Sequence, residues 1–162
     1  MAFMRGLPFA SIALCFLASM AAADDRAICG SVPIKSDAVG ACSRIIAAPR
    51  TSAHDRMMAL TFRADARHSQ GDNSGAIADY SQALALQPDY RPALIGRAIA
   101  YRDTNEPVRA MADFDQAIKL DPKDAKALYE RGVTKSKTGD ATGSDADIAA
   151  AKSINPGIAD KR

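Results

Sequence analysis

Two of the three cysteines and both histidines are the side chains of this sequence best suited to chemistry. Cys29 and Cys42 could form a disulfide, act as a redox couple or bind a metal together with His54 and His68. The cysteines do not have the C-x-x-C spacing of a redox couple, and neither histidine lies at the spacing of a zinc motif. This pattern favours a structural disulfide and no metal site. A thiol-redox pair remains the alternative.

Carboxylates also recur in the sequence, and paired carboxylates can act as a general acid and base. Asp79 and Asp113 precede Tyr80 and Phe114 at matched places of a repeated segment. That match indicates solvated positions on the outer face of a helix instead. His68 is likewise expected to be a solvated residue that interacts with a helix dipole. Because no phosphate-binding loop or nucleophile elbow is present, we predict no enzymatic activity and no cofactor.

The repeated segment determines the organisation of the chain. Its copies occupy 76–88 (AIADYSQALALQP), 110–122 (AMADFDQAIKLDP) and, more weakly, 144–156 (SDADIAAAKSINP). The prolines that end them, Pro88, Pro122 and Pro156, lie 34 residues apart each time. A fixed period of this length indicates stacked supersecondary units.

Each 34-residue frame contains two apolar patterns of helical period with a break between them. The frames are 57–90, 91–124 and 125–158. The breaks carry turn residues, such as Gly71-Asp72 in the first frame, and each second helix stops at its proline. The fold class is therefore predicted to be all-α, built from stacked helix pairs.

Residue size also follows the 34-residue period. Small residues form two columns, and larger residues form a third. The columns are Ala64, Ala98 and Gly132; Ala83, Ala117 and Ala151; and Tyr80, Phe114 and Ile148. Small residues facing large ones at constant spacing allow paired helices to reach native packing density.

These frames resemble tetratricopeptide repeats. The middle frame matches the family pattern at Ala98, Tyr101, Ala110, Phe114, Ala117 and Pro122. The first frame departs at Arg67, and the third departs at Lys135, Ser144 and Ile148, which suggests looser packing there. The resemblance implies an α-solenoid of antiparallel helix pairs, about three repeats long, whose concave face binds a peptide or protein segment.

Aligning the frames to this family predicts a binding surface on the first helix of each pair. Its residues are Ile95, Ile99, Arg102, Lys126, Tyr129 and Val133. An apolar strip rimmed by Arg102, Lys126 and Lys137 would suit an amphipathic segment with some acidic residues. The alternative is that the apolar side chains pack against the neighbouring repeat. Thr61 and Asp65 occupy the places of the Lys/Asn clamp of chaperone-binding relatives, so that clamp is absent.

Residues 1–23 resemble a secretory signal peptide, with Arg5, a short apolar run and Ala21-Ala22-Ala23. We predict cleavage after Ala23 and a periplasmic or secreted location. The alternative is an uncleaved segment that tethers an assembly factor to a membrane. Residues 24–52 are predicted to form an N-terminal cap, in which a short helix over 38–48 is stapled by the two cysteines.

Residues 53–158 form the predicted repeat domain, and 159–162 are a tail. Apolar residues on the outer side of the last helix raise the hypothesis of a weak homodimer through this end. They are Ala146, Ala149, Ala150 and Ile154. The chain has 21 Lys+Arg and 19 Asp+Glu, without the clustered basic footprint that nucleic acid requires. Nucleic acid is therefore not expected as a partner, and the family resemblance implies a protein or peptide.

Overall fold

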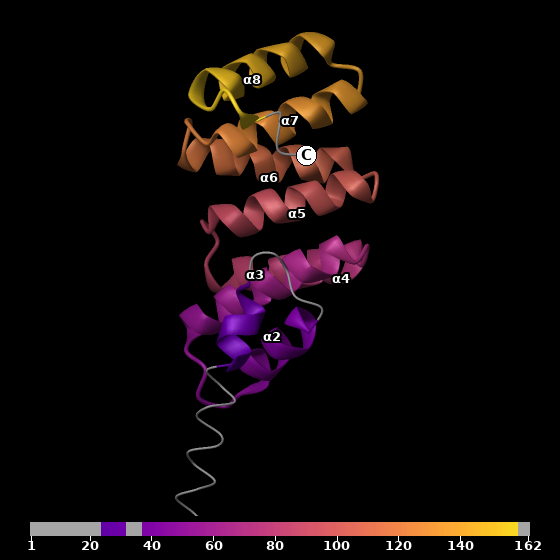
Figure 1. The fold of residues 1–162 in the computed structure, drawn as a ribbon. Coiled ribbons are helices and arrows are strands. Elements are labelled where there is room, and N and C mark those ends of the chain that lie inside the picture. Colours follow the sequence, from indigo (N-terminus) through magenta and orange to yellow (C-terminus); the bar gives the residue numbers. More distant parts are fainter. Residues whose placement is uncertain (1–23, 32–36, 159–162) are drawn as a thin grey trace, which may run out of the picture.

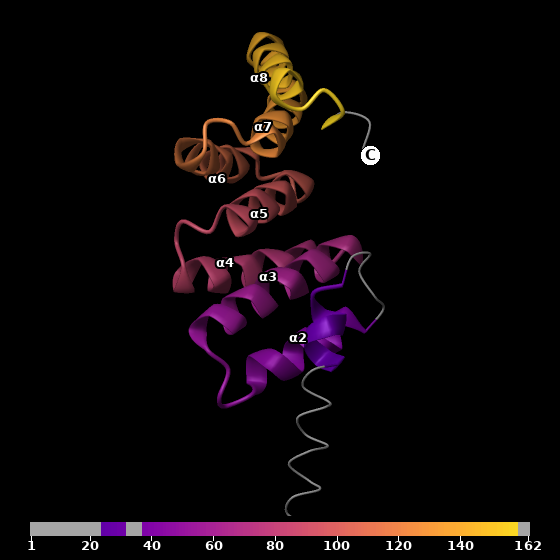
Figure 2. The same ribbon diagram turned by 60° about the vertical axis from the view of Figure 1, so that its left-hand side comes forward.

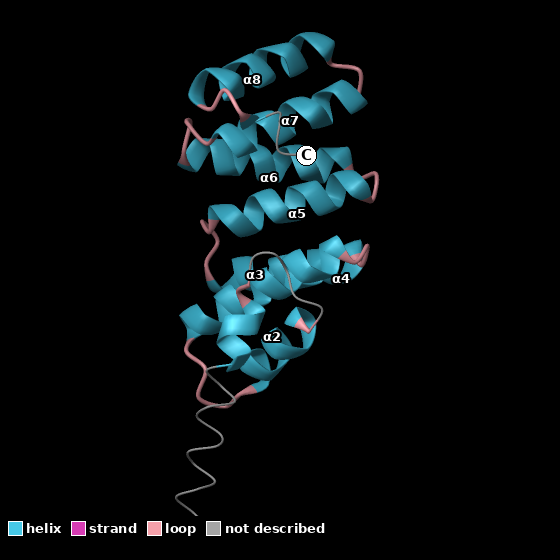
Figure 3. Ribbon diagram, in the orientation of Figure 1, coloured by secondary structure: helices cyan, strands magenta, loops and turns pink. Residues whose placement is uncertain are grey.

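The computed structural model describes residues 24–31 and 37–158. The predicted signal peptide (1–23) and tail (159–162) lie outside the described residues. Throughout the described part the regular elements are helices, and no strand occurs there (Figure 3). None of the described helices is long and apolar enough to span a bilayer.

The helices follow one another in a single stack (Figure 1). A short helix over 24–29 precedes α2 (Ala38–Ala47), α3 (Ala53–Ser69), α4 (Asn73–Leu86), α5 (Arg91–Asp103), α6 (Pro107–Leu120), α7 (Ala125–Lys137) and α8 (Ala141–Ile154). Helices α3 and α4, α5 and α6, and α7 and α8 form three successive pairs. The predicted all-α solenoid with a short N-terminal helix is confirmed.

Local chemistry explains where the helices begin and turn. The side chains of Ser52, Asp72, Asp124 and Asp140 each accept a hydrogen bond from a backbone N–H in the first turn of the following helix. Gly71 and Gly139 adopt φ values of 82° and 89° between paired helices, a conformation that glycine reaches without steric penalty. In the middle pair the turn is made by Asn105, with φ 62°, and by Pro107 at the start of α6.

The columns of small residues lie inside the stack. All six members are buried: Ala64, Ala98, Gly132, Ala83, Ala117 and Ala151. Tyr80 and Phe114 fill the space between helices and are also buried, whereas Ile148 is half-buried. A Cβ atom on Gly132 would lie 2.8 Å from Cγ1 of Ile148, so glycine lets this smaller side chain approach closely.

The stack curves so that one layer of helices is on the inside. Helix α3 contacts α5, and α5 contacts α7. In contrast, α4 and α6 make no such contact, nor do α6 and α8, within the described helices. Elements on the inner side of a curved stack lie closer together, so α3, α5 and α7 line its inner face (Figures 1 and 2).

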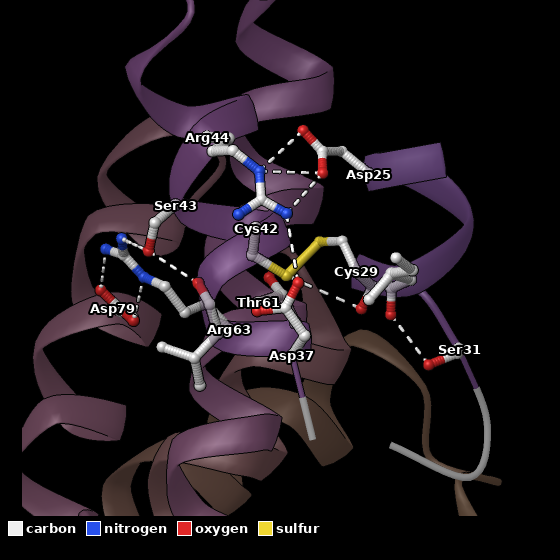
Figure 4. The surroundings of a disulfide bond; sticks show 12 residues. Asp25, Cys29, Ser31, Asp37, Cys42, Ser43, Arg44, Thr61, Arg63 and Asp79 are labelled. Atoms are coloured by element: carbon white, nitrogen blue, oxygen red, sulfur yellow. Dashed lines mark hydrogen bonds and ion pairs between the residues drawn. A yellow bond between two sulfur atoms is a disulfide. The ribbon is translucent and has the colours of Figure 1, made fainter. Parts of the chain in front are cut away.

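The N-terminal cap packs against α3. A disulfide joins Cys29 in the short helix to Cys42 in α2, with the Cα atoms 4.9 Å apart (Figure 4). Both cysteines are buried together with Ala41 and Ala59. Outside this cluster, Arg44 donates hydrogen bonds of 2.6–3.0 Å to the carboxylate of Asp25 and one of 3.2 Å to Asp37. The bonds to Asp25 hold the short helix against α2.

Candidate binding surface

An arginine and an aspartate join the two helices of every repeat. The pairs are Arg63–Asp79, Arg97–Asp113 and Arg131–Asp147, each with two hydrogen bonds of 2.7–2.8 Å. Asp79 is only 1% exposed and Asp113 only 6%. The expectation that these carboxylates are solvated on the outer face is therefore wrong. They are buried because a guanidinium fork satisfies both carboxylate oxygens.

Each of these arginines also reaches an earlier helix of the stack. The additional acceptors are Ser43 Oγ for Arg63 at 3.0 Å, Ser81 Oγ for Arg97 at 3.1 Å and Asp115 Oδ1 for Arg131 at 2.7 Å. One side chain thus joins three helices. The arrangement accounts structurally for the most deeply buried carboxylates.

Two of the residues that depart from the family pattern bind the same carboxylates. Arg67, which replaces a tyrosine, donates to Asp79 at 2.8 Å, and Lys135 lies 2.9 Å from Asp147. Partial burial acts to raise the pKa of Asp147, but hydrogen bonds from Arg131 and Lys135 outweigh it and lower that pKa. A second cation in these two repeats therefore replaces the aromatic ring.

The predicted apolar strip is only partly available on the inner face. Ile95 is 4% exposed and packs in the core, so little of its side chain is accessible to a partner. Ile99 is half-buried against the same core, and Tyr129 and Val133 are half-buried on α7. Lys126 is exposed. The remaining strip consists of Ile99, Tyr129 and Val133, which we call the inner strip.

Arg102 is not the free rim cation that the sequence suggested. Its side chain is 12% exposed, and it donates to Glu130 at 2.5 Å and to Asp103 at 3.2 Å. These two carboxylates of the same chain already balance its charge, so an acidic partner would have to compete with them.

His68 also has a partner in the next repeat. Its Nε2 lies 3.0 Å from Oδ2 of Asp103, which links α3 to α5. Partial burial acts to raise the pKa of Asp103, but the bond to His68 and the charge and bond of Arg102 lower it overall. His68 lies in the last turn of α3 and is partly exposed, as expected, but it also has an acidic partner that the sequence did not indicate.

Asp65 lies on the same face and was missed as a functional candidate. Its Oδ1 accepts a hydrogen bond of 2.5 Å from the hydroxyl of Tyr80. Burial raises the pKa of Asp65, an effect that the Tyr80 bond and the charges of Lys126 and His68 offset only in part. The signal in the sequence was a carboxylate in a column that is otherwise aliphatic.

Comparison with protein families now identifies the repeats. A tetratricopeptide repeat model matches residues 63–125 and 95–142. The chain belongs to the tetratricopeptide repeat family. No curated protein sequence matches it.

Several solved tetratricopeptide structures share its fold. The crystal structure of MamA matches with a TM-score of 0.64 and 19% identity. The match covers 76% of this chain and 70% of the MamA chain. The second tetratricopeptide domain of Spaghetti (RPAP3), bound to the HSP90 peptide SRMEEVD, matches with a TM-score of 0.59 and 23% identity. The match covers 61% of this chain and 92% of that domain. The second domain of human RPAP3 with the HSP70 peptide SGPTIEEVD has a TM-score of 0.61 and 24% identity, with 65% and 88% covered.

Pockets adjoin the tetratricopeptide stack, among them two of similar volume. One, of about 250 Å³, lies on the inner side between α5 and α7 and is lined by Arg91, Pro92, Ile95, Asp124 and Lys126. The other lies between the cap and α3 beside Cys29. No cluster of three or more metal-ligating side chains is found in the part of the chain that the structure describes.

Proposed function

We propose that this tetratricopeptide protein is a non-enzymatic adaptor that binds a peptide or protein segment on its inner face. The observation that carries the proposal is the inner strip, whose apolar side chains remain half-buried on helices that line the concave side. Half-buried apolar groups in a groove gain by excluding water when a partner covers them. The Spaghetti and human RPAP3 domains, which bind peptides, support this use of the fold.

The charged residues support a binding role over an enzymatic one. The buried carboxylates are paired with arginines. Of the acids on the inner face, Asp103, Asp124 and Glu130 pair with His68, Arg91 and Arg102, whereas Asp65 accepts a hydrogen bond from Tyr80. A catalytic acid or base would instead have to be accessible to a substrate and to transfer a proton. The ion pairs serve to hold helices in place.

Site-specific photo-crosslinking of this protein in living cells would test this function. A photo-crosslinking residue at Tyr129 is expected to capture a distinct protein partner. The same residue at Val108 is the matched control, because Val108 is 82% exposed on α6, away from the inner layer. Equal yields from the two positions, or none from Tyr129, would contradict the proposal.

A double substitution examines the inner strip directly. Ile99→Ala with Tyr129→Ala should weaken capture while the circular dichroism spectrum stays helical. Val108→Ala should change neither property. If the double variant unfolds, these side chains belong to the core and the alternative stated from the sequence holds.

Export completes the proposal. Residues 1–23 would direct the chain to a periplasmic or secreted location, where an oxidising environment allows the Cys29–Cys42 disulfide to persist. Mass spectrometry of the cellular protein should find a first residue of Asp24. An intact Met1 would instead support the membrane-tethered assembly factor. A readily reducible disulfide that exchanges with substrate thiols would support the thiol-redox alternative.

The proposal of a weak homodimer rests on the last helix. Ala146, Ala149 and Ile154 are exposed along α8. Sedimentation equilibrium at high concentration tests it, and a strict monomer would exclude it.

A further inference from the structure

Asp65 occupies a position where the fold does not require a carboxylate. The residues 34 positions further along each helix pair are Ile99 and Val133, which are apolar and half-buried. Asp65 is itself half-buried, and taking an ionised carboxylate out of water is unfavourable unless a partner compensates. An aliphatic side chain would serve packing better here. The acid is therefore better explained by a task other than stability.

The hydrogen bond that orients the Asp65 carboxylate is specific to the first repeat. The Tyr80 hydroxyl donates to it, whereas the equivalent residues Phe114 and Ile148 carry no hydroxyl. The tyrosine fits because Gly96 on α5 has no side chain: a Cβ atom there would lie 2.4 Å from Cζ of Tyr80. The equivalent of Gly96 one repeat later is Glu130. The junction between the first and second repeats therefore differs from the next junction in three residues: Asp65, Tyr80 and Gly96.

The other acids of this face already have cationic partners. Asp103 pairs with His68 and Arg102, and Glu130 pairs with Arg102. For Asp65, Tyr80 is the sole hydrogen-bond partner within the described ranges 24–31 and 37–158, and it occupies only Oδ1. Oδ2 is left to solvent, since no fully buried side-chain oxygen of the described residues lacks a partner.

Cationic and apolar side chains both lie near this carboxylate. The charges of Lys126 and His68 act on Asp65, and burial together with the charge of Asp65 raises the pKa of Tyr90. Met58 and Tyr90 pack against the core and remain partly exposed, and the Tyr90 hydroxyl lies 3.2 Å from the Met58 sulfur. Ile99 of the inner strip follows on α5. A half-buried charge such as that of Asp65 interacts more strongly with an opposite charge than it would in bulk water.

We propose that Asp65 is the specificity-determining residue of the inner face and that it receives a lysine or arginine side chain of the bound segment. The proposal rests on the adaptor function above and names its partner chemistry: a segment with a cationic residue flanked by apolar ones, which contact Met58, Tyr90 and Ile99. This polarity is opposite to that of the acidic peptides SRMEEVD and SGPTIEEVD bound by the structural neighbours. It also differs from the expectation of a partner with some acidic residues, which was drawn from Arg102, Lys126 and Lys137.

Selection from a random peptide display library on the protein lacking residues 1–23 tests the proposal. Enriched peptides should carry Lys or Arg next to aliphatic or aromatic residues. Asp65→Asn should weaken their binding at least about 10-fold, the loss expected for one charge-assisted hydrogen bond. Asn keeps the shape and an acceptor for Tyr80, so folding is preserved. Asp145→Asn, at an exposed carboxylate on α8, is the matched control and should have no effect.

A charge exchange adds a second readout. Asp65→Lys should abolish binding of the selected peptide and restore binding of the same peptide with its cation changed to glutamate. Enrichment of acidic or uncharged peptides, or affinity unchanged by Asp65→Asn, would overturn this inference and leave the adaptor function standing. If the unaltered protein enriches no peptide, the adaptor function itself is overturned.

Discussion

Arg97 and Asp113 join the two helices of the central repeat through two parallel hydrogen bonds, Nε to Oδ2 and Nη2 to Oδ1, both 2.8 Å long. The same fork recurs one repeat earlier and one repeat later. Since Arg97 also donates to Ser81 on α4, it orients α5 against both neighbours. The fork therefore fixes the angle within a repeat and the junction between repeats.

Removing the carboxylate of this fork should be costly. Asp113→Ala leaves the largely buried Arg97 without its partner, and we expect a loss of about 3 kcal/mol in the free energy of unfolding. Urea denaturation followed by circular dichroism measures it. The double variant Arg97→Met with Asp113→Leu should recover much of the loss, because no buried charge is left unpaired. Asp89→Ala, at an exposed position, is the control, and a loss for Asp113→Ala no larger than for this control would contradict the role of the fork.

The forks show what the 34-residue period revealed and what it left undetermined. The period predicted the helix pairs, and Ala98 and Phe114 have the buried positions expected of their columns. Arg97 belongs to an equally regular column, but period alone does not say that it faces Asp113, since charged columns usually face solvent. Only the crossing of the two helices places these side chains together.

The inner face was less predictable for a related reason. Ile95 and Ile99 are four residues apart on one helix and share its face, yet one is core and the other is half-buried. The angle at which neighbouring repeats pack decides between them. Asp65 was visible as an exception in its column, but its hydrogen bond depends on Gly96 admitting the Tyr80 ring.

Acid should weaken the third repeat. Because hydrogen bonds from Arg131 and Lys135 lower the pKa of Asp147, this carboxylate stabilises the fold above its unfolded pKa. That contribution is lost as the pH falls through the lowered folded pKa. Asp147→Asn should therefore be destabilising at neutral pH, and its difference from the unaltered protein should shrink in acid. Thermal unfolding between pH 7 and about pH 2 measures it. A difference independent of pH would show that the pair contributes through packing alone.

Asp65 should show the opposite dependence. Burial raises its pKa in the folded protein, so the folded state binds a proton more tightly than the unfolded chain. Stability from this group is greatest in acid and falls as the pH rises from the unfolded pKa through the raised folded pKa. Asp65→Asn should therefore be at least as stable as the unaltered protein at neutral pH, and its relative stability should decline in acid. Greater loss at neutral pH than in acid would mean that the carboxylate is structurally required.

The Cys29–Cys42 disulfide should stabilise the cap more than the repeats. It closes a loop with a sequence separation of 13 residues, for which chain entropy predicts about 3 kcal/mol. In a stack where each unit contacts only its neighbours, loss of this bond should act locally. Cys29→Ser with Cys42→Ser should therefore accelerate amide exchange in 24–31, α2 and the facing turns of α3, while α7 and α8 keep their protection. Reductant added to the unaltered protein should reproduce the pattern, and uniform acceleration across all helices would show that the cap and the repeats unfold as one unit.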